Sequence, residues 1–127
     1  MIFIQHSDLI REVDVFISPH YSRLIMNMSY PTDKILGKDG LLAHSLEDFE
    51  FRPSQIQMAQ LINDCVQRKD FVIIEAGTGT GKTLGYLVPL VQSGKKTVIS
   101  TGTKNLQEQI FLKDIPLLEK ALDFKIR

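Results

Sequence analysis

The chain has 127 residues, about the size of one domain, and contains 15 basic and 15 acidic residues. The resulting net charge of zero excludes a general electrostatic attraction to nucleic acid or to a membrane surface. No apolar run approaches the roughly 20 residues of a membrane span, and the first residues do not have the pattern of a secretory signal. The single cysteine excludes an internal disulfide. We therefore expect a soluble, cytoplasmic protein.

Residues 1–34 have mixed patterning, and we treat them as a segment of unknown role. The stretch from Tyr30 to Asp33 is typical of a turn, and a short helix is expected near residues 41–46. Within the first segment, one set of apolar residues fits a helix face, although the same region also fits a strand. These residues are Ile10, Val13, Phe16 and Ile17.

A longer helix is predicted to begin at Pro53 and to end near Arg68. Proline suits the first turn of a helix, because an N–H group has no intrahelical acceptor there. Apolar residues then follow at helical spacing and predict one buried face, in which Cys65 is a core thiol. This face consists of Met58, Leu61, Ile62, Cys65 and Val66.

The second half of the chain alternates between short strands and helices. Residues 71–74 (FVII) form an apolar run typical of a strand covered on both faces, and residues 97–101 (TVIST) predict a second strand. Helices are expected at residues 81–92, from about Thr103, and at residues 117–122. This order predicts an α/β fold in which the two strands are parallel neighbours.

A phosphate-binding loop, AGTGTGKT, lies between the first strand and the helix that follows it. Its glycines allow positive φ angles and let phosphate approach the backbone N–H groups, and the helix start adds its dipole. The alternative, a glycine-rich hairpin, does not explain the flanking strand and helix. We predict that a nucleoside triphosphate and Mg²⁺ bind here, with Lys82 on the β- and γ-phosphates and the Thr83 hydroxyl on the metal, both as catalytic residues. The binding residues are Ala76, Gly77, Thr78, Gly79, Thr80, Gly81, Lys82 and Thr83.

Three segments in the correct order resemble motifs of the DinG/XPD-like helicases of superfamily 2. Residues 51–58 (FRPSQIQM) are similar to the Q motif, residues 75–89 to motif I, and residues 98–109 (VISTGTKNLQEQ) to motif Ia. The resemblance implies that residues 35–127 are the N-terminal part of a RecA-like P-loop NTPase motor lobe, incomplete here, with a parallel sheet and flanking helices. It also implies that the nucleotide is ATP and that the complete protein is an ATP-dependent DNA helicase.

The resemblance assigns roles to residues outside the P-loop. Gln55 would bind the edge of adenine, and Arg52 would support it or stack on the base, whereas the alternative for Gln55 is a solvated residue of the first helical turn. Neutral side chains after the second strand would hold phosphates of single-stranded DNA. The same side chains also fit a capped helix start, with Thr103 or Ser100 as the cap, and both roles are compatible. The proposed DNA ligands are Thr101, Thr103, Asn105 and Gln107.

The sequence also limits the expected activity. No Asp-Glu pair follows an apolar strand after the P-loop, although ATP hydrolysis in such motors requires one. The four cysteines that hold an iron–sulfur cluster in many members of that family are absent, and the three histidines lack metal-ligand spacing. We therefore expect this chain to bind ATP without hydrolysing it alone; the alternative is a stand-alone nucleotide-binding or interaction module. An exposed sheet edge would also favour self-association.

Overall fold

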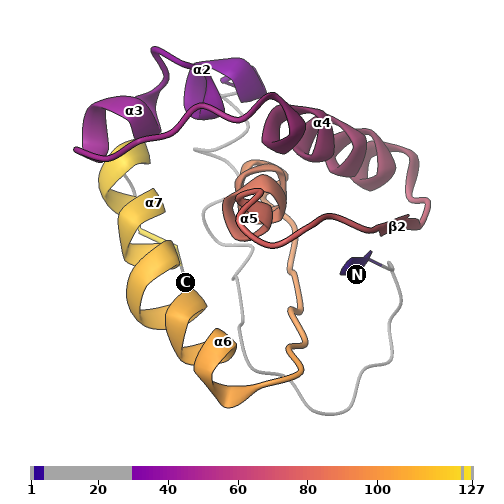
Figure 1. The fold of residues 1–127 in the computed structure, drawn as a ribbon. Helices are drawn as coiled ribbons and strands as arrows, with labels where there is room; N and C mark the ends of the chain where they lie inside the picture. The colour runs from indigo at the N-terminus through magenta and orange to yellow at the C-terminus, as the bar shows by residue number, and fades with distance from the viewer. Residues whose placement is uncertain (1, 5–29, 124, 127) are drawn as a thin grey trace.

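The computed structural model describes residues 2–4, 30–123 and 125–126 (Figure 1). The helix or strand expected near residues 10–17 lies outside the described residues. In chain order, the elements are β1 (Ile2–Ile4), α2 (Thr32–Leu36), α3 (Leu41–Ser45), α4 (Pro53–Arg68), β2 (Val72–Ile74), α5 (Lys82–Gln92), α6 (Lys104–Gln109), the π-helical segment η2 (Ile110–Asp114) and α7 (Ile115–Leu122).

Helix α5 lies at the centre of the fold, with α4 beside it and the α6–η2–α7 segment on another side (Figure 1). Its residues from Gly85 to Val91 are all buried, because apolar side chains surround the helix. The helices α2 and α3 close the core and contribute Ile35, Leu36 and Leu42, each with no exposed surface. Helix α2 begins at Thr32, so the turn expected from Tyr30 leads directly into a helix.

Helix α4 confirms the predicted buried face, with one exception. Met58, Ile62, Cys65 and Val66 are buried, but Leu61 is 56% exposed, so its predicted place in the core is wrong. The reason is that the buried stripe also includes Gln55 and Ala59, which moves its centre away from position 61.

Cys65 is the core thiol that its position in the stripe predicted. Its Sγ–H group donates a hydrogen bond to the main-chain oxygen of Asp70 at 2.9 Å. Burial raises the pKa of this thiol, and the nearby charge of Asp70 raises it further. The thiolate is the nucleophilic form, so Cys65 is expected to be unreactive at neutral pH.

The predicted strand at residues 71–74 is present as β2, but its partner differs from the prediction. Within the described residues, β2 pairs antiparallel with β1, with Phe3 opposite Ile73. Residues 97–101 form no strand in this part of the chain; Val98 makes an isolated β-bridge, and Ile99 packs into the core. The prediction that β2 is covered on both faces is also wrong, because Phe71 and Ile73 are exposed and only Val72 and Ile74 pack against the core. An apolar run does not specify which strand lies beside it or whether both of its faces are covered.

Close packing of α4 against α5 depends on Gly85. A Cβ atom at this position would lie 3.2 Å from the Met58 sulfur atom. Such a contact is tighter than ordinary van der Waals packing, so the glycine lets the two helices approach each other. The helix predicted at residues 81–92 is confirmed as α5, and this contact fixes its position beside α4.

The last part of the chain forms one continuous helical path with a change in its winding. Helix α6 begins after Thr103, as predicted, and the final helix begins at Ile115, two residues earlier than expected. Pro116 is the second residue of α7 and follows directly after the π-helical segment. Between these helices, η2 has the wider winding of a π-helix and buries Ile110 and Asp114.

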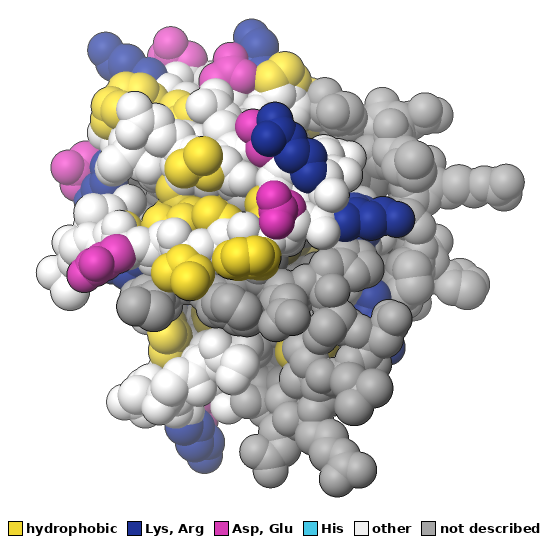
Figure 2. All heavy atoms as spheres, turned by 90° about the vertical axis from the view of Figure 1, so that its right-hand side faces the viewer, with side chains coloured by type: hydrophobic (Ala, Val, Ile, Leu, Met, Phe, Trp, Pro, Cys, Tyr) yellow, Lys and Arg dark blue, Asp and Glu magenta, His cyan; other side chains and the backbone are white. Residues whose placement is uncertain are grey.

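Apolar side chains also lie on the surface. Figure 2 shows a group of them on the face that carries β2 and the end of α4. Among the large exposed apolar residues, Phe71 and Ile73 are 64% and 57% exposed, because alternate side chains of a strand point to opposite faces. No helix among the described residues is long and apolar enough to cross a membrane.

Candidate nucleotide-binding site

The glycine-rich loop connects the end of β2 to the start of α5, as the sequence predicted. Gly79 and Gly81 have φ angles of 76° and 73°, in the left-handed region that favours glycine. Gly81 is the N-cap of α5, and Lys82 and Thr83 are the first two residues of this helix. The loop therefore ends at a helix N-terminus, where unpaired N–H groups and the helix dipole attract anions.

The loop is closed by hydrogen bonds to one of its own carbonyl groups. The Lys82 Nζ atom donates to the main-chain oxygen of Gly77, and the Thr80 hydroxyl donates to the same oxygen at 2.9 Å. A phosphate oxygen is a stronger acceptor for an ammonium group than a neutral carbonyl is. The Lys82 side chain thus already lies over the loop, in reach of an anion that would replace Gly77 as its acceptor.

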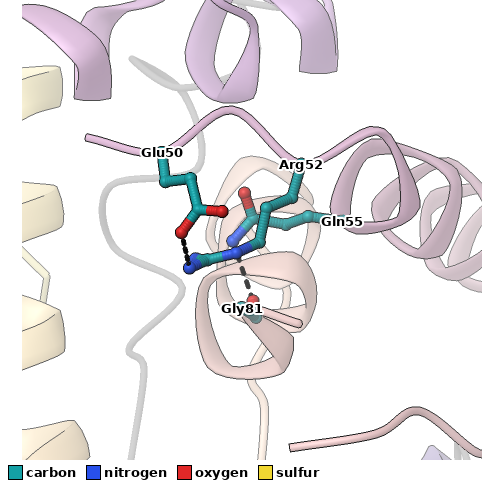
Figure 3. Close-up of polar contacts among 4 residues, drawn as sticks. All are labelled: Glu50, Arg52, Gln55 and Gly81. Carbon is teal, nitrogen blue, oxygen red and sulfur yellow. Dashed lines mark hydrogen bonds and ion pairs between the residues drawn. The ribbon is translucent and has the colours of Figure 1, made fainter. Parts of the chain in front are cut away.

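Gln55 joins α4 to the P-loop (Figure 3). Its Nε2 atom donates to the main-chain oxygen of Gly81 at 2.8 Å, and the same oxygen accepts the N–H group of Gly85 at 3.0 Å. Gln55 is only 3% exposed, so the alternative of a solvated first-turn residue is wrong. The contact spans 26 positions of the sequence, and no local pattern could have predicted it.

One polar atom of Gln55 has no partner. Its Oε1 atom is the buried side-chain acceptor without a hydrogen bond among the described residues. A buried acceptor without a donor is costly, which makes this atom a candidate for ligand binding. The exocyclic amino group of adenine is a donor of suitable type, so the residues present fit the nucleotide that the sequence predicted.

Arg52 lies next to Gln55 but binds a different residue. Its guanidinium group forms an ion pair with the carboxylate of Glu50, and its side chain is 33% exposed (Figure 3). The main-chain oxygen of Arg52, the N-cap residue of α4, accepts the N–H group of Gln55 at 3.0 Å. Arg52 therefore helps to start the helix that carries Gln55, and the sequence did not predict its pairing with Glu50.

The predicted DNA ligands lie at the start of α6. The Thr103 hydroxyl accepts the N–H group of Leu106 at 3.3 Å, which confirms Thr103 as the helix cap. The Thr101 hydroxyl donates to the main-chain oxygen of Thr103 at 3.0 Å. Asn105 is exposed and Gln107 is half-buried, and in the described part of the chain neither side chain has a hydrogen bond to the P-loop.

Histidine, cysteine and acidic side chains do not cluster in the described part of the chain. No group of three or more such residues there could hold a metal ion. His44 lies on α3, whereas His6 and His20 lie outside the described residues. Thr83, the second residue of α5, lies at the N-terminus of this helix.

Comparison with known proteins gives consistent matches over the region that contains the candidate site. The DEAD/DEAH box helicase family matches residues 52–126. The ATP-dependent DNA helicase YoaA of Haemophilus influenzae is 48% identical over 90 residues, which are 71% of this chain and 14% of that protein. YoaA of Escherichia coli is 43% identical over 86 residues, 68% of this chain and 14% of that protein.

A third relative is named for a different activity. The 3'-5' exonuclease DinG of Staphylococcus epidermidis is 45% identical over 80 residues, 60% of this chain and 9% of that protein. The chain therefore spans no more than about 14% of the length of these curated relatives. No solved structure matches the chain significantly.

Proposed function

Because the chain belongs to the DEAD/DEAH box helicase family, we propose that it is the ATP-binding part of a DinG-like ATP-dependent DNA helicase. The observation that supports this most directly is the P-loop at the start of α5, held against α4 by the hydrogen bond between Gln55 and Gly81. In this proposal, residues 35–127 are the N-terminal part of a RecA-like lobe whose complete form has a parallel sheet. Residues 1–34 have no assigned role in this proposal.

Each part of the site has a role in ATP binding. The backbone of residues 76–81 and the start of α5 surround the phosphates, Lys82 contacts the β- and γ-phosphates, and Thr83 ligates Mg²⁺. Bound magnesium neutralises part of the phosphate charge. Gln55 accepts from the adenine amino group through its unpaired Oε1 atom. Arg52 supports Gln55 or stacks on the base. Because no Asp-Glu pair follows an apolar strand after the P-loop, the chain alone binds ATP without turnover.

Titration calorimetry of the isolated chain with ATP tests this proposal. We expect one ATP to bind per chain, more tightly with Mg²⁺ than with EDTA, and no phosphate release. GTP is the control, because its O6 atom is an acceptor where adenine has a donor, so Gln55 Oε1 would face a second acceptor. Absence of ATP binding, or equal affinity for GTP, would contradict the proposed site.

Single-stranded DNA is the proposed second ligand, held by the side chains of Thr101, Thr103, Asn105 and Gln107. Neutral donors are compatible with the zero net charge of the chain, because they bind phosphate without a basic surface. Fluorescence anisotropy with a labelled oligonucleotide should show weaker binding for the double variant Asn105→Ala/Gln107→Ala. The control Gln60→Ala, an exposed position on α4, should bind like the unchanged chain. Equal binding by all three chains would reject this assignment.

Self-association through the small sheet is part of the same proposal. The exposed side chains of Phe71 and Ile73 support it, because an open strand with apolar side chains is prone to pair with another chain. Size-exclusion chromatography should return a dimer or larger species at high concentration. A monomer at all concentrations would count against it.

A further inference from the structure

The π-helical segment η2 joins α6, which carries the proposed DNA ligands Asn105 and Gln107, to α7. The two helices are anchored differently. Helix α6 has no buried residue, whereas α7 packs against α3 and buries Ile115, Leu118 and Leu122. The winding of η2 therefore determines the direction in which the side chains of α6 point relative to the anchored helix α7.

Main-chain hydrogen bonds show where the winding changes. The N–H group of Ile110 is shared between the oxygens of Leu106 and Gln107, so Leu106 accepts from four positions ahead as in an α-helix. The N–H group of Ile115 instead donates to the oxygen of Ile110, five positions back. Ile110 and Ile115 are both buried, although α-helical winding would place side chains five positions apart about 140° from each other. The π turn thus keeps both residues in the core.

One side-chain pair spans the π turn. The Gln109 Nε2 atom donates to the Asp114 Oδ2 atom at 3.2 Å. These residues are also five positions apart, so π winding places them one above the other, whereas α winding would place them on different faces of the helix. Asp114 is only 7% exposed, and the exposed residue Gln109 supplies a donor for its carboxylate. This hydrogen bond is therefore compatible with π winding and is lost in α winding.

We propose that Gln109 and Asp114 are positioning residues that hold the π turn and thereby orient Asn105 and Gln107 toward single-stranded DNA. Conversion of η2 to α winding would remove one residue from the turn and rotate α6 relative to α7 by about 100°. The exposed side chains of α6 would then point in another direction. This inference rests on the proposed function, because it concerns the orientation of the proposed DNA ligands. Gln109 and Asp114 act through the helix and not by binding DNA.

Substitutions of the same shape break and restore this hydrogen bond. In Gln109→Glu two carboxylates face each other, and no donor remains. In the double variant Gln109→Glu/Asp114→Asn the donor and the acceptor are exchanged, so the bond forms in the reverse direction at the original net charge. Asp114→Asn alone keeps an acceptor oxygen for Gln109. Gln60→Glu adds the same charge as Gln109→Glu at an exposed glutamine of α4 and is the matched control.

The first test needs no ligand. NMR scalar couplings across hydrogen bonds, measured on the full chain, identify the carbonyl group that accepts each N–H group. The N–H group of Ile115 should couple to the carbonyl of Ile110 in the unchanged chain, in Asp114→Asn, in Gln60→Glu and in the double variant. In Gln109→Glu this coupling should be lost and replaced by a coupling to Phe111, four positions back. A coupling to Ile110 that persists in Gln109→Glu, or that does not return in the double variant, would overturn the proposal.

The second test measures the effect on the DNA ligands by fluorescence anisotropy with a labelled single-stranded oligonucleotide. Gln109→Glu should bind about 2- to 10-fold more weakly than Gln60→Glu, the range expected for one hydrogen bond, and the double variant should bind like the unchanged chain. Equal binding by Gln109→Glu and Gln60→Glu, or no recovery in the double variant, would overturn the positioning role. If the unchanged chain does not bind the oligonucleotide, the proposed DNA assignment fails and this positioning role fails with it. The NMR couplings still decide whether the bond between Gln109 and Asp114 holds the π turn.

Discussion

Gly81→Ala is expected to lower the free energy of unfolding of the nucleotide-free chain by about 1–3 kcal/mol more than Gly79→Ala does. This difference excludes the backbone strain, which both variants have. Both glycines have φ angles near 75°, so an alanine at either position carries a similar backbone cost of about 1–2 kcal/mol. Only at Gly81 would the new Cβ atom overlap another group, at 2.2 Å from the Gln55 Nε2 atom. At Gly79 nothing lies within 4 Å. Urea denaturation of the two variants measures the difference.

A double variant assigns this difference to Gln55. The Gln55 side chain is buried, so it has little room to avoid the new methyl group and would lose its bond to the Gly81 oxygen. In a Gln55→Ala background the overlap is absent, and the cost of Gly81→Ala should fall to that of Gly79→Ala. Equal destabilisation by the two single glycine variants, or an unchanged difference in that background, would show that this contact does not hold the loop.

Lys82→Ala is expected to weaken ATP binding about 10- to 100-fold, because a hydrogen bond to a charged group contributes about 1.5–3 kcal/mol. The stability of the chain should change by less than about 0.5 kcal/mol, since the Lys82 side chain is bound to the carbonyl of a surface loop. Calorimetric titration with ATP and Mg²⁺ measures the loss.

Lys34→Ala is the charge-matched control for this substitution. Lys34 is an exposed residue of α2, so its removal changes the net charge by the same amount without touching the loop. Its ATP affinity should equal that of the unchanged chain. If Lys34→Ala weakened binding as much as Lys82→Ala, the effect would come from overall charge, and the proposed role of Lys82 would be rejected.

The parts of the site that could be predicted are those encoded by neighbouring residues. The P-loop, the helix that follows it and the helix beginning at Pro53 all have local signals, such as glycine spacing, helical periodicity and a proline in the first turn. The Thr103 cap is local in the same sense, because its hydroxyl binds an N–H group three positions away.

The remaining features depend on contacts between distant residues. Gln55 meets Gly81 only after α4 packs on α5, and the antiparallel pairing of β1 with β2 brings together segments about 70 positions apart. The burial of Asp114 also had no sequence signal, because a lone carboxylate is usually exposed and a π-helical turn has no clear periodicity. Apolar patterning therefore predicted most of the buried face of α4, but it failed for the outward-facing residues Phe71 and Ile73 and did not predict which groups meet in the core.

The close packing of Gly85 against Met58 fixes the distance between the two ends of the candidate nucleotide site. Gln55 and Met58 lie about one turn apart on α4, and Gly81 and Gly85 lie one turn apart on α5, so the two helices meet along a short seam. The proposed base ligand lies on one helix and the phosphate ligands begin the other. The packing of these two helices thus sets the distance between the groups proposed to bind the base and those proposed to bind the phosphates. Because the Gln55 Nε2 atom on α4 binds the Gly81 oxygen, a movement of α4 relative to α5 would also shift the phosphate loop.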